Sequence, residues 1–280
     1  MKKRLPLRSL LMVFALLAAL QAAAAETYQI VLRFRAGEVR RYSVEETLVL
    51  KLQMPGQGTI EAKTVIRATL RQEILRVDSD GAAEMACRME SWQRRNWANG
   101  SEVASDPKEK EEILGFRLRL KASPNGAVQI LDPAELPGTI SPEAYADYDS
   151  FLPARPVAVG EEWTKSFNFR MEGVDCPTTV RNRLEKVETI GKTRVATIGQ
   201  EFQQEVTEFS IPLEDPLIGQ ATAAGTFLGA GVISFDLDLG YLKEEACLFQ
   251  GRLVARVQTG GAKMEIPMEM ELSTLSVLVP

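Results

Sequence analysis

The sequence predicts an all-β protein made of two related antiparallel units with long strands. Three observations support this fold class. Apolar and polar residues alternate with a period of two over most of the chain, turn residues interrupt the alternation, and the pattern begins again after a proline-rich stretch. Because alternate residues of a strand face the same side of a sheet, each strand has one apolar face. We expect a curved sheet, a half-barrel or a sandwich, with one short helix between the units.

The same short motif opens both units. Residues 36–40 read Ala-Gly-Glu-Val-Arg, and residues 159–163 read Val-Gly-Glu-Glu-Trp. Such self-similarity predicts that one supersecondary unit is used twice, although hairpins that recur by chance would give the same outline. The expected organisation is a signal peptide at 1–25, a first β repeat at 26–131, a linker with a short helix at 132–156, and a second β repeat at 157–280.

The first 25 residues have the three parts of a secretory signal peptide. Basic residues at 2–4 and 8 precede an apolar run at 10–20 and a small-residue segment at 22–25. The apolar run is too short for a convincing membrane span, and no lipid-accepting cysteine follows it. We expect a periplasmic or secreted protein with no stable membrane span once the signal is removed.

The charge balance argues against an anionic partner. The chain has 33 basic and 38 acidic residues, a net charge of −5; four of the basic residues lie in the signal peptide, so 29 basic residues face 38 acidic ones in the remainder, a net charge of −9. Nucleic acids and anionic membranes select a basic face, so neither is expected. The expected partner is an unknown envelope protein or a hydrophobic small molecule.

In the first unit, alternation predicts strands at 28–34, at 42–54 and from 60 onwards. The apolar positions of the third strand change from even to odd numbers near Gln72, where Leu75 and Val77 take over, so a bulge or bend is expected there. Residues 78–81, Asp-Ser-Asp-Gly, predict a tight hairpin turn.

From Gln93 to Glu112 the chain is polar and loses its period, which predicts a surface excursion with Trp92 and Trp97 at its base. These tryptophans are candidate ligand-binding residues; the alternative is that they cap an edge of the core. A strand at 114–120 and the turn at 124–126 complete the unit.

The linker contains a helix signal, because Ser141 is an N-cap residue and Pro142 suits the first helical position. We expect a helix from Pro142 to about Phe151. In the second unit, strands are expected from 163, around 180–189, at 194–209, at 241–249 and at 264–273. The small residues of 221–231 predict a bulge, a corner or a close approach of another backbone or ligand. The strand at 241–249 has little polar relief and is expected near the centre of the sheet.

The segment at 159–163, followed by Gly231, Phe235-Asp236 and Gly240, resembles uncharacterised bacterial secreted and lipoprotein families built from β-repeats. The resemblance covers about half of the mature chain and rests on turn glycines and one aromatic residue. It implies an exported β-protein and brings no known active site.

Three cysteines allow at most one internal disulfide. Cys87 and Cys247 occupy apolar positions, so they are either buried thiols or a bridge between the two units. Cys176 lies in a turn-like segment and is expected to be accessible. The chain has no Cys-x-x-Cys motif, so redox catalysis is not expected.

Catalysis and cofactors are not expected. The chain has no histidine, the commonest acid or base at neutral pH and the commonest transition-metal ligand. Glu161 and Glu162 are the candidates for a carboxylate-based hydrolase, but neighbours on a strand face opposite sides. Asp236 and Asp238 share a face and are weak candidates for a calcium ion; the alternative is that they are turn acids.

Methionines suggest a further ligand-binding hypothesis. An adaptable apolar lining would result if the strands curl into an open trough, and the candidate residues are Met85, Met89, Met264, Met268 and Met270. Periplasmic lipid carriers use such a half-barrel, by analogy of fold alone; the alternative is that the methionines fill a dry core. The sequence therefore predicts an exported, non-catalytic envelope protein that is a binding or structural module, with a periplasmic carrier of a lipid or other hydrophobic ligand and a carboxylate-based hydrolase as alternatives.

Overall fold

The computed structural model describes residues 26–105, 107–132, 152–171, 174–210, 220–259 and 262–280. Within these ranges the chain consists of antiparallel strands and a single helix. The elements are β1 (Thr27–Tyr28), β2 (Val39–Met54), β3 (Gly58–Val77), β4 (Ala83–Ala98), β5 (Ser101–Val103), α2 (Pro107–Gly115), β6 (Arg117–Ala122), β7 (Val128–Ile130), β8 (Val157–Ala158), β9 (Glu162–Met171), β10 (Val174–Ile190), β11 (Thr193–Ser210), β12 (Gln220–Asp236), β13 (Tyr241–Thr259) and β14 (Ala262–Val279).

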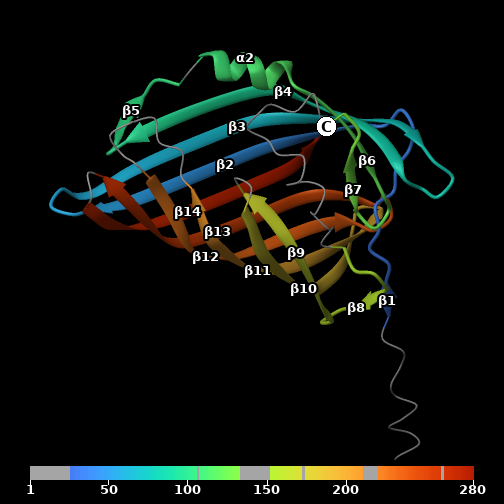
Figure 1. Cartoon of the computed structure of the whole chain (residues 1–280). Coiled ribbons are helices and arrows are strands. Elements are labelled where there is room, and N and C mark those ends of the chain that lie inside the picture. The colour runs from blue at the N-terminus through green and yellow to red at the C-terminus, as the bar shows by residue number, and fades with distance from the viewer. Residues whose placement is uncertain (1–25, 106, 133–151, 172–173, 211–219, 260–261) are drawn as a thin grey trace, which may run out of the picture.

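The long strands form one open sheet. Its order is β7-β6-β4-β3-β2-β14-β13-β12-β11-β10-β9, with β5 paired to β4, while β1 and β8 form a separate pair. The last strand, β14, pairs with β2 from Val279↔Arg41 to Met268↔Leu52, so the two expected units share a sheet. Figure 1 shows this sheet bent into a trough, with β4 and β10 on opposite sides. The all-β, antiparallel, curved-sheet prediction is confirmed.

The turns that open the two units have matching hydrogen bonds. The N–H of Gly37 donates to the carbonyl of Ile74 at 2.8 Å, and the N–H of Gly160 donates to the carbonyl of Leu184 at 2.7 Å. Both glycines have positive φ, 80° and 87°, a conformation that side chains with a Cβ disfavour. The two copies therefore agree at their first turn, and the duplication of the whole unit stays a prediction.

The extended segment at 28–34 crosses one end of the trough. Only Thr27–Tyr28 pairs as a strand, so the expected strand over 28–34 is wrong for most of its length. Instead, the N–H of Leu32 donates to the carbonyl of Pro124 in the β6–β7 turn, and the N–H of Arg33 donates to the carbonyl of Gly240 in the β12–β13 turn. The segment thus ties the two sides of the sheet together, and its apolar residues plug that end.

Arg40 holds this plug from the end of β2. Its side chain is 5 % exposed, donates to the carbonyl of Arg33 at 2.7 Å and pairs with Glu38 at 2.9 Å. Its guanidinium also lies over the rings of Phe34 and Tyr241, 5.6 and 5.0 Å from their centroids. A buried cation is tolerated only when its donors are paired, and these contacts supply the partners.

We expect Arg40→Met to lower the free energy of unfolding by about 3 kcal/mol, because it leaves Glu38 and the carbonyl of Arg33 without their partner. Chemical denaturation measures this change. Arg41→Met is the matched control, since Arg41 also pairs with a glutamate, Glu90, but its own side chain is 40 % exposed; that variant should change the unfolding free energy by less than about 1 kcal/mol. Equal losses of unfolding free energy in the two variants would contradict the role of Arg40 in holding the segment at 28–34.

The predicted register change in the third strand is confirmed and located. The pairing of β3 with β4 shifts between Ile74 and Arg76 and again between Thr69 and Leu70. Leu75 is the extra residue and is 44 % exposed, so the expectation that it takes over the apolar face is wrong. The predicted hairpin also forms, with the N–H of Gly81 donating to the carbonyl of Asp78 at 3.0 Å.

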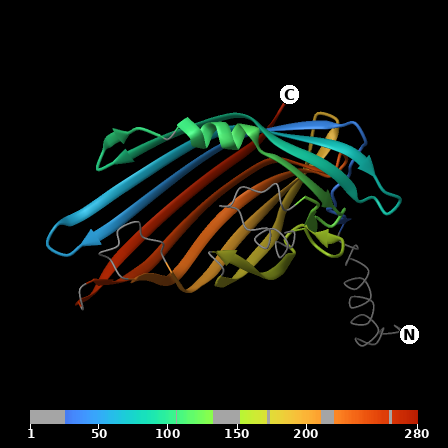
Figure 2. The ribbon, with the colours of Figure 1, turned by 45° about the horizontal axis from the view of Figure 1, so that its top comes forward.

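The polar excursion is more ordered than expected. Strand β4 continues to Ala98, β5 returns beside it, and α2 follows, so the expectation of an irregular loop over 93–112 is wrong. Figure 2 shows α2 lying along β4, and Glu109 of the helix accepts from Arg94 at 2.5 Å.

The helix expected at 142–151 lies outside the described residues, which resume at Leu152. In the described part of the chain, no helix combines the length and apolarity that a membrane crossing requires.

Candidate functional site: the inner face of the sheet

One face of the long strands is apolar, and we call it the inner face. It carries two buried clusters: one around Leu184, Ile198 and Phe235 of β10 to β12, and one around Ile74, Met85 and Leu120 of β3, β4 and β6. Both clusters pack against the segment at 28–34, with Ile30 in the first and Phe34 against the second. Since two distant parts of one face converge on one segment, the inner face is the concave face.

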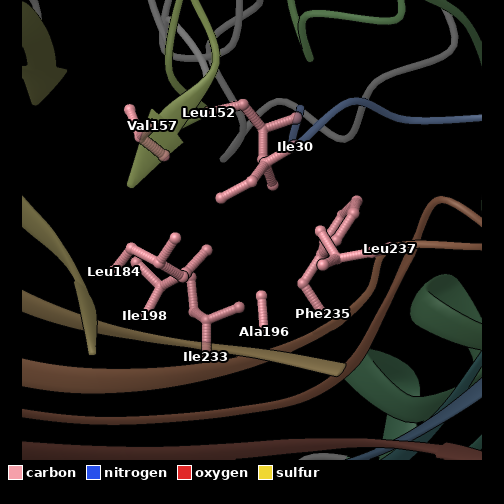
Figure 3. Packing of buried hydrophobic residues seen from close by; sticks show 9 residues of the cluster. All are labelled: Ile30, Leu152, Val157, Leu184, Ala196, Ile198, Ile233, Phe235 and Leu237. Carbon is pink, nitrogen blue, oxygen red and sulfur yellow. The ribbon is translucent and has the colours of Figure 1, made fainter. Parts of the chain in front are cut away.

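The plugged end of the trough is a dry core. Figure 3 shows Ile30, Leu152 and Val157 lying over the inner residues of β10 to β12. The nine buried residues of this cluster are at most 4 % exposed. These residues are as tightly enclosed as an ordinary protein core, so this end has no room for a ligand.

The other half of the inner face is apolar but less enclosed, and we call it the open half. Its large side chains are partly buried, and they are Leu48, Leu50, Leu52, Phe202, Phe227, Phe249, Met268, Met270 and Leu272. A small buried cluster of Cys176, Val206 and Leu253 lies among them. This half therefore combines the composition of a core with the exposure of a surface, which is typical of a ligand site.

Glycines shape the open half by letting phenylalanine rings lie flat on the sheet. Phe227 is opposite Gly251, and Phe249 is opposite Gly229. A Cβ built at Gly251 would lie 2.2 Å from the Phe227 ring, and a Cβ at Gly229 would lie 2.6 Å from the Phe249 ring. The predicted close approach at the small residues of 221–231 is confirmed, because a Cβ at Gly225 would meet the carbonyl oxygen of Arg252 at 2.1 Å.

A row of polar side chains, which we call the polar belt, separates the plugged end from the open half. Cross-strand pairing aligns its members in one row across six strands; they are Asn182, Gln200, Cys247, Thr274 and Glu46, with Gly231 of β12 between Gln200 and Cys247. Glu245 and Ser276 lie one inner-face position nearer the plug and are paired with each other. The belt thus crosses an otherwise apolar face.

The belt contains polar groups without partners. Gln200 donates to Asn182 at 2.9 Å, which leaves Asn182 Nδ2 and Gln200 Oε1 buried with no hydrogen-bond partner. Burial raises the pKa of the Glu46 carboxyl and that of Glu245, although the thiol of Cys247, 3.7 Å away, lowers the latter slightly. Buried polar atoms are normally satisfied, so this belt is an unusual part of the structure.

The predicted ligand-binding residues are divided between several places. Met268 and Met270 line the open half, and Met264 follows on the same face at its far end, whereas Met85 is a buried member of the plugged core. Met89 is partly buried and pairs with Leu70.

The two predicted tryptophans do not form a common rim. Trp92 pairs with Ala68 on the inner face, whereas Trp97 pairs with Lys63 on the outer face. Trp97 is held there between Lys63 and Arg95, whose charges lie 5.7 and 4.9 Å from its ring centroid. The structure therefore does not bring the two together at one binding edge.

The weak metal candidates stabilise a turn. Asp236 accepts from the N–H groups of Asp238 and Leu239 at 3.1 and 2.8 Å, and Asp238 pairs with Arg194 at 2.6 Å. Within the described ranges, no three His, Cys, Asp or Glu side chains are grouped closely enough to hold a metal ion. The described acids of this turn have protein partners.

All three cysteines are free and buried. Cys87 and Cys247 are therefore not bridged, and their buried-thiol alternative is confirmed. The expectation that Cys176 is accessible is wrong, because its side chain points inward from β10 and is fully buried. The turn-like sequence before it misled that prediction, since β10 begins at Val174 and includes Cys176.

Sequence reasoning missed the polar belt and an apolar patch on the outer face. The patch consists of Leu228, Val232, Leu248 and Leu275, each 41–59 % exposed. A shallow hollow of about 450 Å³ lies beside it, lined by Ala230, Leu248 and Leu275 among others. The sequence signal for the patch is that β13 has apolar residues on both of its faces. The signal for the belt is Glu46, which interrupts the apolar positions of β2.

Comparisons with known proteins give a fold likeness and no family. No protein-family model and no curated protein matches the chain. A structure of lipovitellin that concerns its lipid–protein interactions has a TM-score of 0.51 and 11 % identity, covering 89 % of this chain and 26 % of lipovitellin. This chain thus spans about a quarter of that protein. Two mutant porins of Rh. blastica, at 10 % and 7 % identity, cover 86 % of this chain and 100 % of their own, each with a TM-score of 0.19.

Proposed function

We propose that this protein binds and carries a lipid or another hydrophobic ligand in the open half of its trough, within the cell envelope. The observation that carries the proposal is the contrast between the two halves of one concave face. The plugged half is closed by the segment at 28–34, whereas nine large apolar side chains of the open half stay partly exposed. Leaving that much apolar surface in contact with water is unfavourable, and a ligand would remove it.

Further support comes from composition and from fold. The first 25 residues match the pattern of an export signal and the chain has no histidine, which supports a non-catalytic role in the envelope. The lipovitellin structure concerns lipid–protein interactions, and its similarity supports the proposal at the level of fold. The periplasmic location and the lack of catalysis are parts of this proposal.

Two experiments test it. Native mass spectrometry of the protein purified from its own host is expected to show a co-purifying lipid, and a clean apoprotein would weaken the carrier in favour of a structural module. Nile red, a neutral apolar fluorophore, is expected to bind the delipidated protein with a blue-shifted, enhanced emission. Absence of Nile red binding at micromolar protein together with a clean apoprotein would overturn the proposed function.

A pair of adjacent variants locates the site. Leu50 and Met270 are cross-strand partners on the inner face, whereas Val49 and Glu271 are the neighbouring partners on the outer face. Leu50→Gln with Met270→Gln is expected to weaken Nile red binding by about tenfold, because each amide is buried without a partner in the complex. Val49→Gln with Glu271→Gln should leave the affinity unchanged. If the outer-face pair weakens Nile red binding more than the inner-face pair, the site lies on the outer face and the proposed location is contradicted.

A further inference from the structure

The polar belt lies where the apolar part of a bound ligand would end. On β2, Glu46 separates the plugged positions Tyr42 and Val44 from the open half, which begins at Leu48. The nine residues from Glu46 to Met54 are separated by eight steps of about 3.3 Å and so span roughly 26 Å of strand. An extended acyl or alkyl chain can lie along this length with its polar end at the belt.

In the described part of the chain, the two carboxyl groups at the belt have no cation as a partner. Glu46 and Glu245 lie on either side of β14, and neither has an ion-pair partner among the described residues. The inner-facing positions of β12, of β13 from Glu245 to Val257, and of β14 have neither lysine nor arginine. Two inner-facing cations lie near Glu46: Arg40 on β2, and Arg94 on β4, which pairs with Ile66 in the same cross-strand row. Both already have partners, since Arg40 binds Glu38 and the carbonyl of Arg33, and Arg94 binds Asn96 and Glu109. A buried carboxylate without a cation is costly, so it favours a ligand that supplies one.

A second feature of the belt points independently to a ligand with hydrogen-bonding groups. Asn182 is 0 % and Gln200 is 4 % exposed, and between them they leave one donor and one acceptor unused. Both side chains project from the inner face in the same cross-strand row as Glu46. An unsatisfied buried amide is unfavourable by an amount comparable to a lost hydrogen bond, which a polar group of the ligand would restore.

We propose, on the premise of the proposed function, that the ligand is an amphiphile with an apolar chain and a positively charged amino group, whose chain lies in the open half and whose amino group is held at the polar belt by Glu46 and Glu245. An ammonium has three donors and no acceptor, so it can bind two carboxylates at once. Glu46 and Glu245 are separated by one intervening strand and by one inner-face position, roughly 12 Å between their backbones, which two glutamate side chains extending toward one amino group can span. An anionic head group would instead meet two like charges in an apolar setting, where repulsion is poorly screened.

The same geometry predicts a dependence on pH. Burial favours the protonated, neutral form of both carboxyls, and a bound ammonium favours the ionised form, so binding releases protons. Affinity for the amine should therefore rise as the pH rises through the carboxyl pKa values. Among the described inner-facing neighbours on β12, β14 and β3, Ile233, Ser276, Thr274 and Ile66 do not titrate; the thiol of Cys247 has its pKa raised to about 12 and stays neutral throughout. Beyond Ile66 in the same row, Arg94 of β4 is paired with Glu109.

The test compares probes of one chain length on the delipidated full chain. Dodecylamine, dodecanoate and dodecanol, each below its micellar concentration, would displace Nile red in parallel titrations. We expect dodecylamine to bind about tenfold or more tightly than dodecanoate, with dodecanol between them. In the variant Glu46→Gln with Glu245→Gln, the ratio of the amine and acid affinities should fall to near one. The matched control, Glu45→Gln with Glu244→Gln, changes the adjacent outer-face carboxylates and should keep the wild-type ratio.

The outcomes separate the two proposals. If Nile red binds and the fatty acid binds as tightly as the amine, or if the Glu46 and Glu245 variant keeps the wild-type ratio, the cationic head group is overturned and the hydrophobic site stands. If the outer-face control changes the ratio as much as the inner-face variant, the preference arises from overall charge and the belt assignment is overturned. If Nile red itself does not bind the delipidated wild type, the failure belongs to the proposed function.

Discussion

Phe235→Ala is expected to lower the free energy of unfolding by about 3–5 kcal/mol, because it removes a fully buried ring from the plugged core. The ring lies among Ile30, Ile233 and Leu237, as Figure 3 shows. Because the paired strands fix the backbone on one side of the ring, the surrounding side chains cannot fill the cavity completely. Denaturation in guanidinium chloride, followed by tryptophan fluorescence, measures the change.

Phe249→Ala is the informative control for this prediction. Phe249 also lies on the inner face, but it is in the open half, is partly buried and has the Phe202 ring 4.8 Å away. We expect Phe249→Ala to cost clearly less stability than Phe235→Ala and to weaken Nile red binding, because its ring is part of the proposed lining. Phe235→Ala should cost more stability than Phe249→Ala and should leave Nile red binding unchanged. Equal stability losses, with equal effects on binding, would contradict the division of the trough into a core and a site.

The long strands could be predicted because their signal is local. In β2 and β14, most of the positions on one face are apolar, and only an extended strand places alternate residues on one face. The turn at 78–81 was also predictable, since Asp-Gly supplies the backbone conformation that a tight hairpin requires. Predictions of this kind depend on neighbouring residues alone.

The curvature, the plug and the strand order could not be predicted in the same way. The pairing of β2 with β14 joins segments more than 200 residues apart, and no local pattern specifies it. The segment at 28–34 alternates as a strand does, yet its backbone finds partners in two turns, at Pro124 and Gly240, from opposite units. Alternation gives the face of a residue but does not identify what covers that face.

The start of helix α2 has a sequence signal, an N-cap residue followed by proline. Asp106-Pro107 is the same pairing of an N-cap residue with a proline that predicted a helix at Ser141-Pro142. The polar composition of 93–112 concealed it, since α2 has no buried residue and its apolar periodicity is weak. The polar belt is concealed for a similar reason: in the sequence Glu46 is a single interruption of an apolar stripe, and only the sheet register aligns it with Gln200 and Asn182.

The buried ionisable groups predict that the protein loses stability at high pH. Burial raises the pKa of the Cys87 thiol from 9.0 to about 12 and that of the Tyr42 hydroxyl from 10.0 to about 12. Both groups are neutral when protonated, so below pH 9 the folded and unfolded chains hold the same protons and stability is complete. Between pH 9 and 12 the unfolded chain releases protons that the folded chain retains, so the free energy of unfolding falls as the pH rises.

For Cys87 this loss amounts to about 4 kcal/mol over three pH units, at about 1.4 kcal/mol per unit, and Tyr42 adds about 3 kcal/mol. Guanidinium denaturation at pH 8, 9, 10 and 11 measures the slope. Cys87→Ala leaves a small cavity in the plugged core at pH 8 but removes one of the two thiols whose pKa is raised to about 12, the other being Cys247, so its stability should decline less steeply above pH 9 than that of the wild type. Adding Tyr42→Phe should flatten the curve again between pH 10 and 11. If the unfolding free energy declines equally with pH in the wild type and both variants, these groups are solvated in the folded protein. The plugged end would then not be a dry core, and the contrast with the open half would be lost.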